Sequence, residues 1–453
     1  MNASPSLLEG DVGGHIRRLS LPLAWGMLAL TSFSVADTYF ISKLGTRELA
    51  ALGFCIPVVM FFMGVIFGLS IATTSVVARQ HGTGDREKVR RISTDAMTIS
   101  TVIILAVSAA GYLLTEPIFA LIGADADLMP MIRQYMALWY VALPFLSAMI
   151  VGNSCMRGLG ETKYVSHIMT ALAVSNIVLD PLFIFGWGPF PRLGFAGAAV
   201  AHVVACFAVC MISYYYLIFR FEVTAQGSLI HAGLRDSWKR LMHVALPSIL
   251  SNQIAPVSAA VITWMAASFG QEAVAALGVA TRLDRVSTII FFSSGTAVAI
   301  FAGQNHGAGK FERIREAMDK AMRSAMLWGV FFFALFWVFA EELPRIFDEN
   351  PDVVAYTKLY LIWVPISYGA MGVMILANAV LNAVGRPVPA TVLVLLRTII
   401  IYIPLAFVLR EFWGFTGILI ALMVTNFAVG ILSYVWNRRI ADRAQQEAGA
   451  AKA

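Results

Sequence analysis

The sequence predicts an all-α polytopic membrane protein, with twelve transmembrane helices in two six-helix lobes related by a pseudo-two-fold axis along the membrane normal. Composition is the first reason. Of 453 residues, 59% are hydrophobic and 13% are charged, against about a quarter charged in soluble domains. The apolar runs are the second reason, since each can cross a hydrocarbon core of about 30 Å as a helix. They do not alternate as the strands of a barrel would.

Twelve apolar runs give the expected helices. The first six lie at 15–42, 49–79, 91–115, 129–154, 163–187 and 195–220. The second six lie at 239–268, 274–303, 314–342, 353–380, 387–410 and 414–437. We therefore expect an N-terminal lobe at 1–220, a cytoplasmic linker at 221–238, a C-terminal lobe at 239–437 and a cytoplasmic tail at 438–453.

Lys and Arg predict the orientation, because positively charged loops stay on the cytoplasmic side. They gather near 17–18, 79–91, 157–163, 235–240, 310–320 and 438–443, while most opposite loops are acidic or balanced. Both termini are thus expected in the cytoplasm, in the inner (plasma) membrane. The net charge of +6 is spread over these loops, which argues against nucleic-acid binding. The first apolar run is too long for a cleavable signal peptide.

An internal repeat is the third reason for the predicted fold. Residues 42–91 align without gaps to 267–316, and further on Gly160 matches Gly385. After a small slip, the segment from Gly194 to Gly197 matches the segment from Gly414 to Gly417. Six helices repeated in the same orientation indicate parallel lobes, and such transporters bind substrate between their lobes.

The repeat also shows which residues packing alone does not explain. Asp37 corresponds to Ile262, Asp180 to about Ile403, and His202 to about Leu422. The acids within spans therefore concentrate in the N-terminal lobe, apart from Asp284.

A carboxylate inside a membrane helix normally faces a cavity and serves ion or proton traffic. Asp37 is the first candidate, with a capped interfacial acid as the alternative. Asn176 and Asp180 are four residues apart and share a helix face. Pro22 provides a bend point before Asp37, and Pro181 leaves a carbonyl oxygen free in the preceding turn.

Three further polar residues are expected to complete this network: Tyr140, Asn153 and His202. An ordinary interior tyrosine is the alternative for Tyr140.

The C-terminal lobe offers fewer polar candidates. Arg282 and Asp284 point to different sides of one helix, so we expect no pair between them. Arg397 is a candidate partner of Asp284, either in a structural ion pair or in substrate gating. Gln253 is a further polar candidate. Cys55, Cys155, Cys206 and Cys210 lack metal-ligand spacing and are expected to be packing residues.

The chain resembles the multidrug and toxic compound extrusion (MATE) family, in its DinF-like bacterial and archaeal branch. The resemblance covers nearly the whole chain. Its motifs are the twelve-helix duplication, the spacing of Pro22 and Asp37, Gly45-x7-Gly53, Gln80-His81-Gly82 with its twin Asn305-His306-Gly307, Arg157-Gly158-x-Gly160, and Asn176-x3-Asp180-Pro181. The last is the most specific.

The resemblance implies export of cationic or amphipathic small molecules in exchange for H⁺ or Na⁺ by alternating access. It implies no enzyme, no cofactor, no nucleic acid and a monomer in the lipid bilayer. It places the coupling-ion site at Asp37, Asn176 and Asp180, with Tyr140 and Asn153 nearby. The carboxylates that NorM-like relatives carry near Gln253 and Tyr368 have no clear counterpart.

His202 stands where relatives often carry threonine. Imidazole is a poor Na⁺ ligand and titrates near neutral pH, so H⁺ is the expected coupling ion. Na⁺ at Asp37, Asn176 and Asp180 stays as the alternative. The second alternative is a flippase for lipid-linked precursors. Such a flippase needs cationic residues to bind the pyrophosphate of the precursor, and the candidates in this sequence are Arg282, Arg285 and Arg397.

Overall fold

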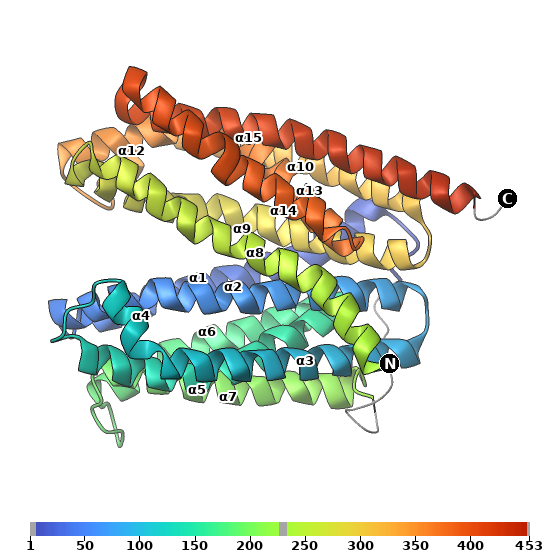
Figure 1. Ribbon diagram of the computed structural model, residues 1–453, viewed down its shortest axis with the longest axis horizontal. Helices are drawn as coiled ribbons and strands as arrows, with labels where there is room; N and C mark the ends of the chain where they lie inside the picture. Colours follow the sequence, from blue (N-terminus) through green and yellow to red (C-terminus); the bar gives the residue numbers. More distant parts are fainter. Residues whose placement is uncertain (1–5, 226–232, 451–453) are drawn as a thin grey trace. The chain divides into compact units, whose positions relative to one another are not determined.

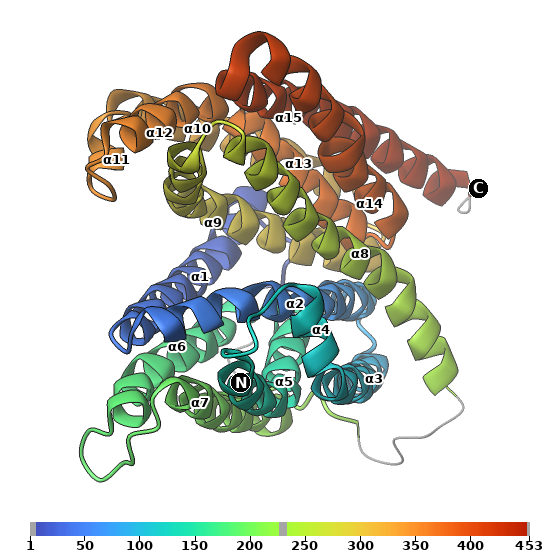
Figure 2. The same cartoon turned by 60° about the vertical axis from the view of Figure 1, so that its left-hand side comes forward.

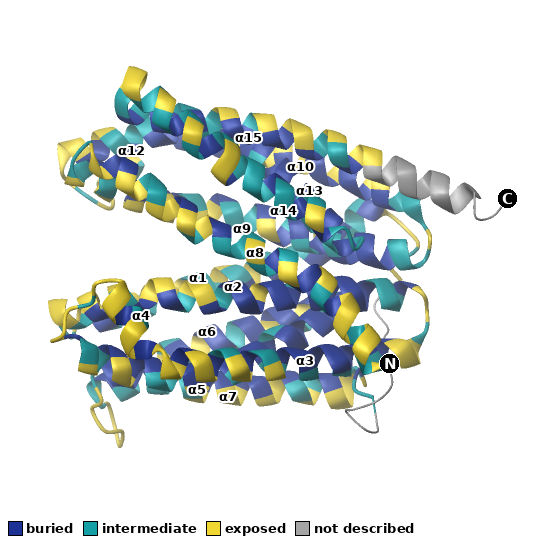
Figure 3. Ribbon diagram, in the orientation of Figure 1, coloured by how far each residue is buried: buried dark blue, intermediate teal, exposed yellow. Residues whose placement is uncertain are grey.

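A computed structural model describes residues 6–225 and 233–450, with side chains described up to residue 439. Eleven helices in this part are long and apolar enough to cross a membrane. The last of them, Pro387–Arg439, is 53 residues long and contains two of the predicted spans. Exposed residues recur along the helices (Figure 3), and many of them are large and apolar, as expected where lipid replaces water. The predicted all-helical membrane fold is confirmed.

The chain divides into two compact units. Unit 1 comprises Met1–Ser20 and Leu250–Ala453, and unit 2 comprises Leu21–Ile249. The boundaries fall inside two helices, α1 (Val12–Ser42) and α8 (Leu234–Ala267). The units therefore differ from the predicted lobes at 1–220 and 239–437, because the first turns of each half pack with the other half. Residues 226–232 of the linker and 451–453 of the tail lie outside the described residues.

Unit 2 is a helical bundle centred on α5 (Met129–Gly158), which packs against α2 (Thr46–Gly82), α3 (Arg86–Leu113) and α7 (Phe195–Tyr215) (Figures 1 and 2). Its other elements are α4 (Thr115–Leu121), α6 (Thr162–Phe185) and the π-helical segment η1 (Tyr216–Arg220). The α4 end of unit 2 is defined as the end where α1 ends and α5 begins.

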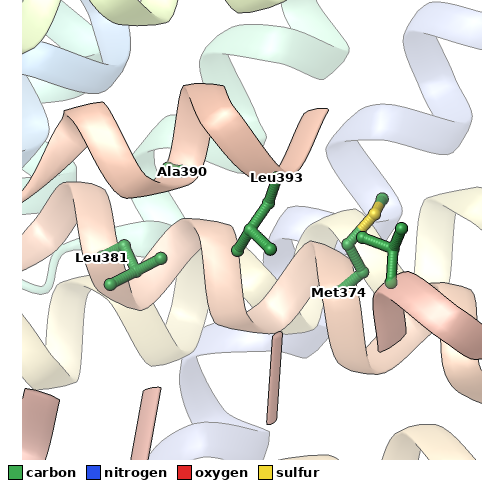
Figure 4. Packing of buried hydrophobic residues seen from close by; sticks show 5 residues of the cluster. Met374, Leu381, Ala390 and Leu393 are labelled. Carbon is green, nitrogen blue, oxygen red and sulfur yellow. The ribbon is translucent and has the colours of Figure 1, made fainter. Parts of the chain in front are cut away.

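In unit 1, α13 (Tyr368–Ala383) is central and packs against α9 (Gln271–Gly307), α10 (Phe311–Val338) and α15 (Ile403–Ala450). The other elements are α11 (Glu342–Arg345), α12 (Pro351–Trp363), the 3₁₀ segment η2 (Val364–Ser367), α14 (Pro387–Leu395) and the π-helical segment η3 (Leu396–Tyr402). Leu393 of α14 belongs to the same apolar cluster as Met374 and Leu381 of α13 (Figure 4).

The repeat is visible in the backbone of one turn. Gly194 has φ 59° and ψ −133°, and its counterpart Gly414 has φ 56° and ψ −137°, a conformation that only glycine adopts readily. Three residues later, a Cβ on Gly197 would lie 2.3 Å from a carbonyl oxygen of α6, and one on Gly417 would lie 2.2 Å from that of Leu409. Gly414 thus separates the eleventh and twelfth predicted spans.

The first described residues bind unit 1 before α1 enters unit 2. The carbonyl oxygens of Leu7, Leu8 and Gly10 accept hydrogen bonds from Asn305, Lys310 and Arg313. Asp11 accepts hydrogen bonds from the backbone N–H of Gly14 at 2.6 Å and from Lys320 Nζ at 3.1 Å. These bonds, with the backbone bond first, lower the pKa of Asp11 to about 2. The segment is therefore tied down by charged and backbone groups together.

Candidate functional site

Unit 2 brings two acids together near its α4 end. Asp37 lies five residues before the end of α1, and Asp180 lies five residues before the end of α6. Both are therefore about 8 Å along the axis from their helix ends. The two carboxylates are close enough to interact electrostatically. The repeat asymmetry thus singled out two residues that share one site.

Neither acid is satisfied by the protein itself. Asp180 is 1% exposed, and both of its carboxylate oxygens lack a hydrogen-bond partner. Asp37 is half-buried, and it too has no hydrogen bond or ion pair to another described residue. An unpartnered buried oxygen costs about 1–3 kcal/mol, and a charge costs more. The site therefore favours a bound proton or cation.

Asn176 is held in place beside the acids by His202. Its side-chain Nδ2 donates to the carbonyl oxygen of Leu172 at 2.8 Å, and its Oδ1 lies 3.1 Å from His202 Nδ1. Because an amide oxygen only accepts, Nδ1 must carry the hydrogen. His202 Nε2 then accepts from the thiol of Cys206, whose Sγ lies 3.5 Å away. A neutral imidazole therefore satisfies both neighbours, so the geometry gives His202 the task of orienting Asn176.

Tyr135 is a member of the site that the sequence analysis missed. It lies on α5, is buried, and is close to both Asp37 and Asp180. Its ring stacks on Phe195 of α7, with centroids 4.5 Å apart. Tyr135 lies six residues from the start of α5, or about 9 Å along its axis. Asp37 and Asp180 lie at nearly the same distance from the ends of their helices. This shared distance is the sequence signal that could have identified Tyr135 as a member of the site.

The structure separates two predicted members from this site. Tyr140 is about 17 Å along α5, where its ring meets Phe62 and its carbonyl oxygen accepts from Ser108 of α3. Asn153 lies about 36 Å along α5, near its other end, and accepts a hydrogen bond from Ser213. Tyr140 therefore fits the interior-tyrosine alternative, and Asn153 is too far away to contact the acids.

Both predicted bend points lie inside continuous helices. Pro181 follows Asp180 in α6, and α6 continues to Phe185. It has no N–H to offer the carbonyl oxygen of Ile177. Pro22 lies in α1, two residues after Ser20, which is the last residue of the N-terminal segment of unit 1. The weakened turn of α1 thus coincides with its passage between units.

The matching region of unit 1 is apolar. Ile262 and Leu422, the counterparts of Asp37 and His202, pack against one hydrophobic cluster. Its buried members are Met265, Tyr402, Ala406, Ile418 and Ala421. The positions that carry Asp37 and His202 in unit 2 are therefore filled by packed apolar side chains in unit 1.

Unit 1 has a polar cluster of different composition. Asp284 of α9 accepts hydrogen bonds from the hydroxyls of Tyr360 and Tyr368. Arg397 donates from Nε to Asn426 Oδ1 at 2.9 Å, and no direct ion pair joins it to Asp284 among the described residues. Asp284 and Arg397 are close enough to interact electrostatically, so Arg397 is a neighbour of Asp284 without a direct ion pair. Arg397 lies in η3, and π-helical turns of this kind are frequent at functional sites.

The two remaining polar candidates of the C-terminal half, Arg282 and Gln253, lie on different helices of unit 1. Arg282 is exposed on α9, and Gln253 lies on the part of α8 that belongs to unit 1. Within the side chains described, no group of three or more His, Cys, Asp or Glu residues is placed to hold a metal ion.

Comparisons with known proteins agree on one family. The MatE family model matches residues 22–182 and 247–408. An FAD transporter of Shewanella oneidensis is 34% identical over 436 residues, which cover 96% of each chain. A probable multidrug resistance protein of Bacillus subtilis, YpnP, is 25% identical over 90% of this chain and 91% of its own. The crystal structure of the Vibrio cholerae MATE transporter VcmN in the bent form matches with TM-score 0.91 and 27% identity, over 96% of this chain and 98% of its own.

Proposed function

The chain belongs to the MatE family, whose members are membrane transporters and not enzymes, and from that premise we propose that it exports a small organic molecule in exchange for H⁺. It acts as a monomer of the plasma membrane, by alternating access, with both termini in the cytoplasm and without a cofactor. The observation that carries the proposal is Asp180, a buried carboxylate with no protein partner beside a second acid.

H⁺ is favoured over Na⁺ by the hydrogen bonds of Asn176. Na⁺ needs several oxygen ligands, and the hydrogen bond from His202 occupies one of the two lone pairs of the Asn176 amide oxygen. A proton needs only one carboxylate oxygen, and Asp180 has two without a partner. His202 keeps Asn176 oriented and does not itself carry the transported proton.

Helix α1 links proton binding to the change of conformation. A proton on Asp37 or Asp180 removes charge from an unpartnered carboxyl group and so changes how α1 packs on unit 2. Pro22 lets α1 bend where it leaves unit 1. Proton entry thereby favours one of two arrangements of α1, and substrate release follows that arrangement.

FAD, or a closely similar flavin dinucleotide, is the proposed substrate. The support is the FAD transporter, whose identity to this chain extends over nearly all of both sequences. Cationic amphiphiles are the second candidate, since the acids of unit 2 would attract them and a multidrug resistance relative exists at lower identity. A cation would compete directly with the proton for Asp37 and Asp180, whereas FAD would not.

Proteoliposomes with separately imposed gradients test the coupling ion. We expect a pH gradient alone, in Na⁺-free buffer, to drive FAD transport, and Asp180→Asn to abolish it. His202→Thr should shift the pH dependence or introduce sensitivity to Na⁺, because Asn176 loses its partner. Transport that requires Na⁺ at every pH would overturn the proton assignment.

The same vesicles distinguish the substrates. FAD transport without ethidium transport supports the flavin proposal. Transport of ethidium, inhibited competitively by protons, together with no FAD transport would replace it by the cationic one. Resistance to ethidium in a pump-deficient host provides a second measurement of cation export.

A further inference from the structure

Two arginines of unit 2 lie close together at the end opposite its α4 end, where α2 ends and α8 begins (Figure 1). Arg79 lies three residues before the end of α2, and Arg240 lies six residues after the start of α8. The two guanidinium groups are close enough to interact electrostatically. Like charges repel, and Arg79 is partly buried, so the pair is unfavourable unless an anion lies beside it.

The packing of α2 on α8 places the two arginines beside each other. The helices touch at Gly68 of α2, where a Cβ would lie 2.7 Å from the backbone nitrogen of Ile249 in α8. From this contact, Arg79 is eleven residues further along α2, and Arg240 is nine residues back along α8. These separations are about 17 Å and about 14 Å along the helix axes. The two helices therefore run antiparallel and carry the arginines at similar distances from their contact.

The described acids nearby do not pair with either arginine. Asp85, which follows α2, pairs with Lys88, and Asp95 of α3 accepts a hydrogen bond from Ser237 of α8. Asp236 lies one turn before the second arginine on α8, but no ion pair joins the two described side chains. The positive charge of the pair is therefore left without a direct counter-charge from the described part of the chain.

Arg79 is oriented by a hydrogen bond that leaves its outer nitrogens free. Its Nε donates to the carbonyl oxygen of Ser75, one turn earlier in α2, at 3.3 Å. Neither Nη atom of Arg79 bonds another described residue. The planar fork of a guanidinium matches two oxygens of one phosphate. Arg240 is exposed on the neighbouring helix and adds a second positive charge, so the pair suits a phosphate group.

The surroundings favour a lipid headgroup over a soluble phosphate. Trp238, two residues before Arg240, is 43% exposed, and exposed tryptophans are enriched where a membrane protein crosses the interface. In the proposed orientation this end of unit 2 lies at the cytoplasmic leaflet, which carries anionic lipids. Basic pockets between transmembrane helices on that side bind anionic headgroups.

We propose that the phosphate of an anionic phospholipid binds between Arg79 and Arg240 and ties the start of α8 to α2. The site is independent of the transported substrate and of the coupling ion, and takes only its leaflet from the proposed orientation. Helix α8 leaves unit 2 after Ile249 and continues in unit 1. The lipid thus anchors, in unit 2, one end of a helix that both units share.

Lipid binding to the detergent-purified full chain tests the site. Native mass spectrometry would compare phosphatidylglycerol with phosphatidylcholine, whose headgroup has a phosphate but no net charge. We expect Arg79→Gln and Arg240→Gln each to weaken phosphatidylglycerol binding about 10-fold, with phosphatidylcholine binding weak throughout. The double variant should bind only slightly more weakly than either single one, because both arginines hold the same phosphate. Lys239→Gln is the matched control, since it removes an exposed positive charge next to Arg240 and should leave binding unchanged.

Each outcome decides whether the two arginines form one lipid site. Equal weakening by Lys239→Gln and Arg240→Gln would reveal general attraction to a basic surface and overturn the site. Effects of Arg79→Gln and Arg240→Gln that multiply in the double variant would overturn the shared phosphate. Inorganic phosphate that binds through the same arginines and displaces the lipid would support a phosphate site and overturn the lipid as its ligand. If Arg79→Gln fails to fold, Arg240→Gln decides against the same control, since its side chain makes no hydrogen bond to another described residue.

Discussion

Replacing Asp180 by leucine should make the protein more stable and inactive at once. Leucine has the same branching as aspartate, with two methyl groups in place of the two carboxylate oxygens. Both oxygens of Asp180 are buried without a partner, so the substitution removes an unfavourable burial and adds apolar contact. It also removes the group that we assign to the transported proton.

The size of the gain follows from the two orphaned oxygens. Each costs about 1–3 kcal/mol when buried unpaired, which gives about 4 kcal/mol for the pair. The methyl groups are larger than the oxygens, and the resulting overpacking destabilises the protein by about 1–3 kcal/mol. A net gain of about 2 kcal/mol remains. Unit 2, Leu21–Ile249, falls in the range of 150–250 residues for which each kcal/mol shifts Tm by about 2–4 °C, so we expect the Tm for unfolding of unit 2 to rise by about 4–8 °C.

Thermal unfolding of the detergent-purified variants measures this gain, and Asp95→Leu is the matched control. Asp95 is as deeply buried, at 2% exposed, but it accepts a hydrogen bond from Ser237. Leucine there strands the Ser237 hydroxyl and should lower stability by about 1–3 kcal/mol. If Asp180→Leu lowers Tm as Asp95→Leu does, then Asp180 is satisfied in the protein, and the reasoning that assigns the proton to it fails.

Three further outcomes are expected. Asp37→Asn should leave folding intact, by size-exclusion profile, and abolish pH-driven efflux, whereas Ile262→Val at the duplicated position should transport normally; normal transport by Asp37→Asn would refute the site. Gly417→Ala should yield little folded protein because its Cβ would meet a carbonyl oxygen at 2.2 Å, while Gly278→Ala, with open space around it, should express normally. Asp11→Asn should speed amide hydrogen exchange in the first turn of α1 at pH 7. Because the pKa of Asp11 is lowered to about 2, the stabilisation of this turn by the Asp11 carboxylate is complete above about pH 4 and disappears as the pH falls towards 2. Unchanged exchange at pH 7 would contradict this role of Asp11.

The fold was largely readable from the sequence, since apolar length decides where a helix can cross the membrane. The run at 195–220 contains α7 and η1, and the gap between 410 and 414 coincides with the non-helical Gly414. The 3₁₀ segment at Val364–Ser367 was not predicted. The unit boundaries inside α1 and α8 were not either, because long-range packing leaves no local pattern.

The site was readable only in part. Asp37 and Asp180 stood out because their duplicated positions are apolar, and the structure brings them together. The placement of Asn153 in this site was wrong. Its polar side chain made it a candidate, but a rise of 1.5 Å per residue puts it far from the acids along α5. Tyr135 was missed because the rotation of α5 about its axis is set by its neighbours, which the sequence of α5 does not contain.

The unit boundaries inside α1 and α8 also bear on how a duplicated chain of this kind arose. Each half of the sequence gives the first turns of its leading helix to the other half: residues up to Ser20 pack with the second, and residues up to Ile249 pack with the first. In a single-copy ancestor, the same exchange would be domain swapping between two identical six-helix chains. Such an ancestor would be an obligate dimer, and fusion of its genes would preserve the swap. Fragments ending at 225 and beginning at 233 should therefore assemble only when they are produced together.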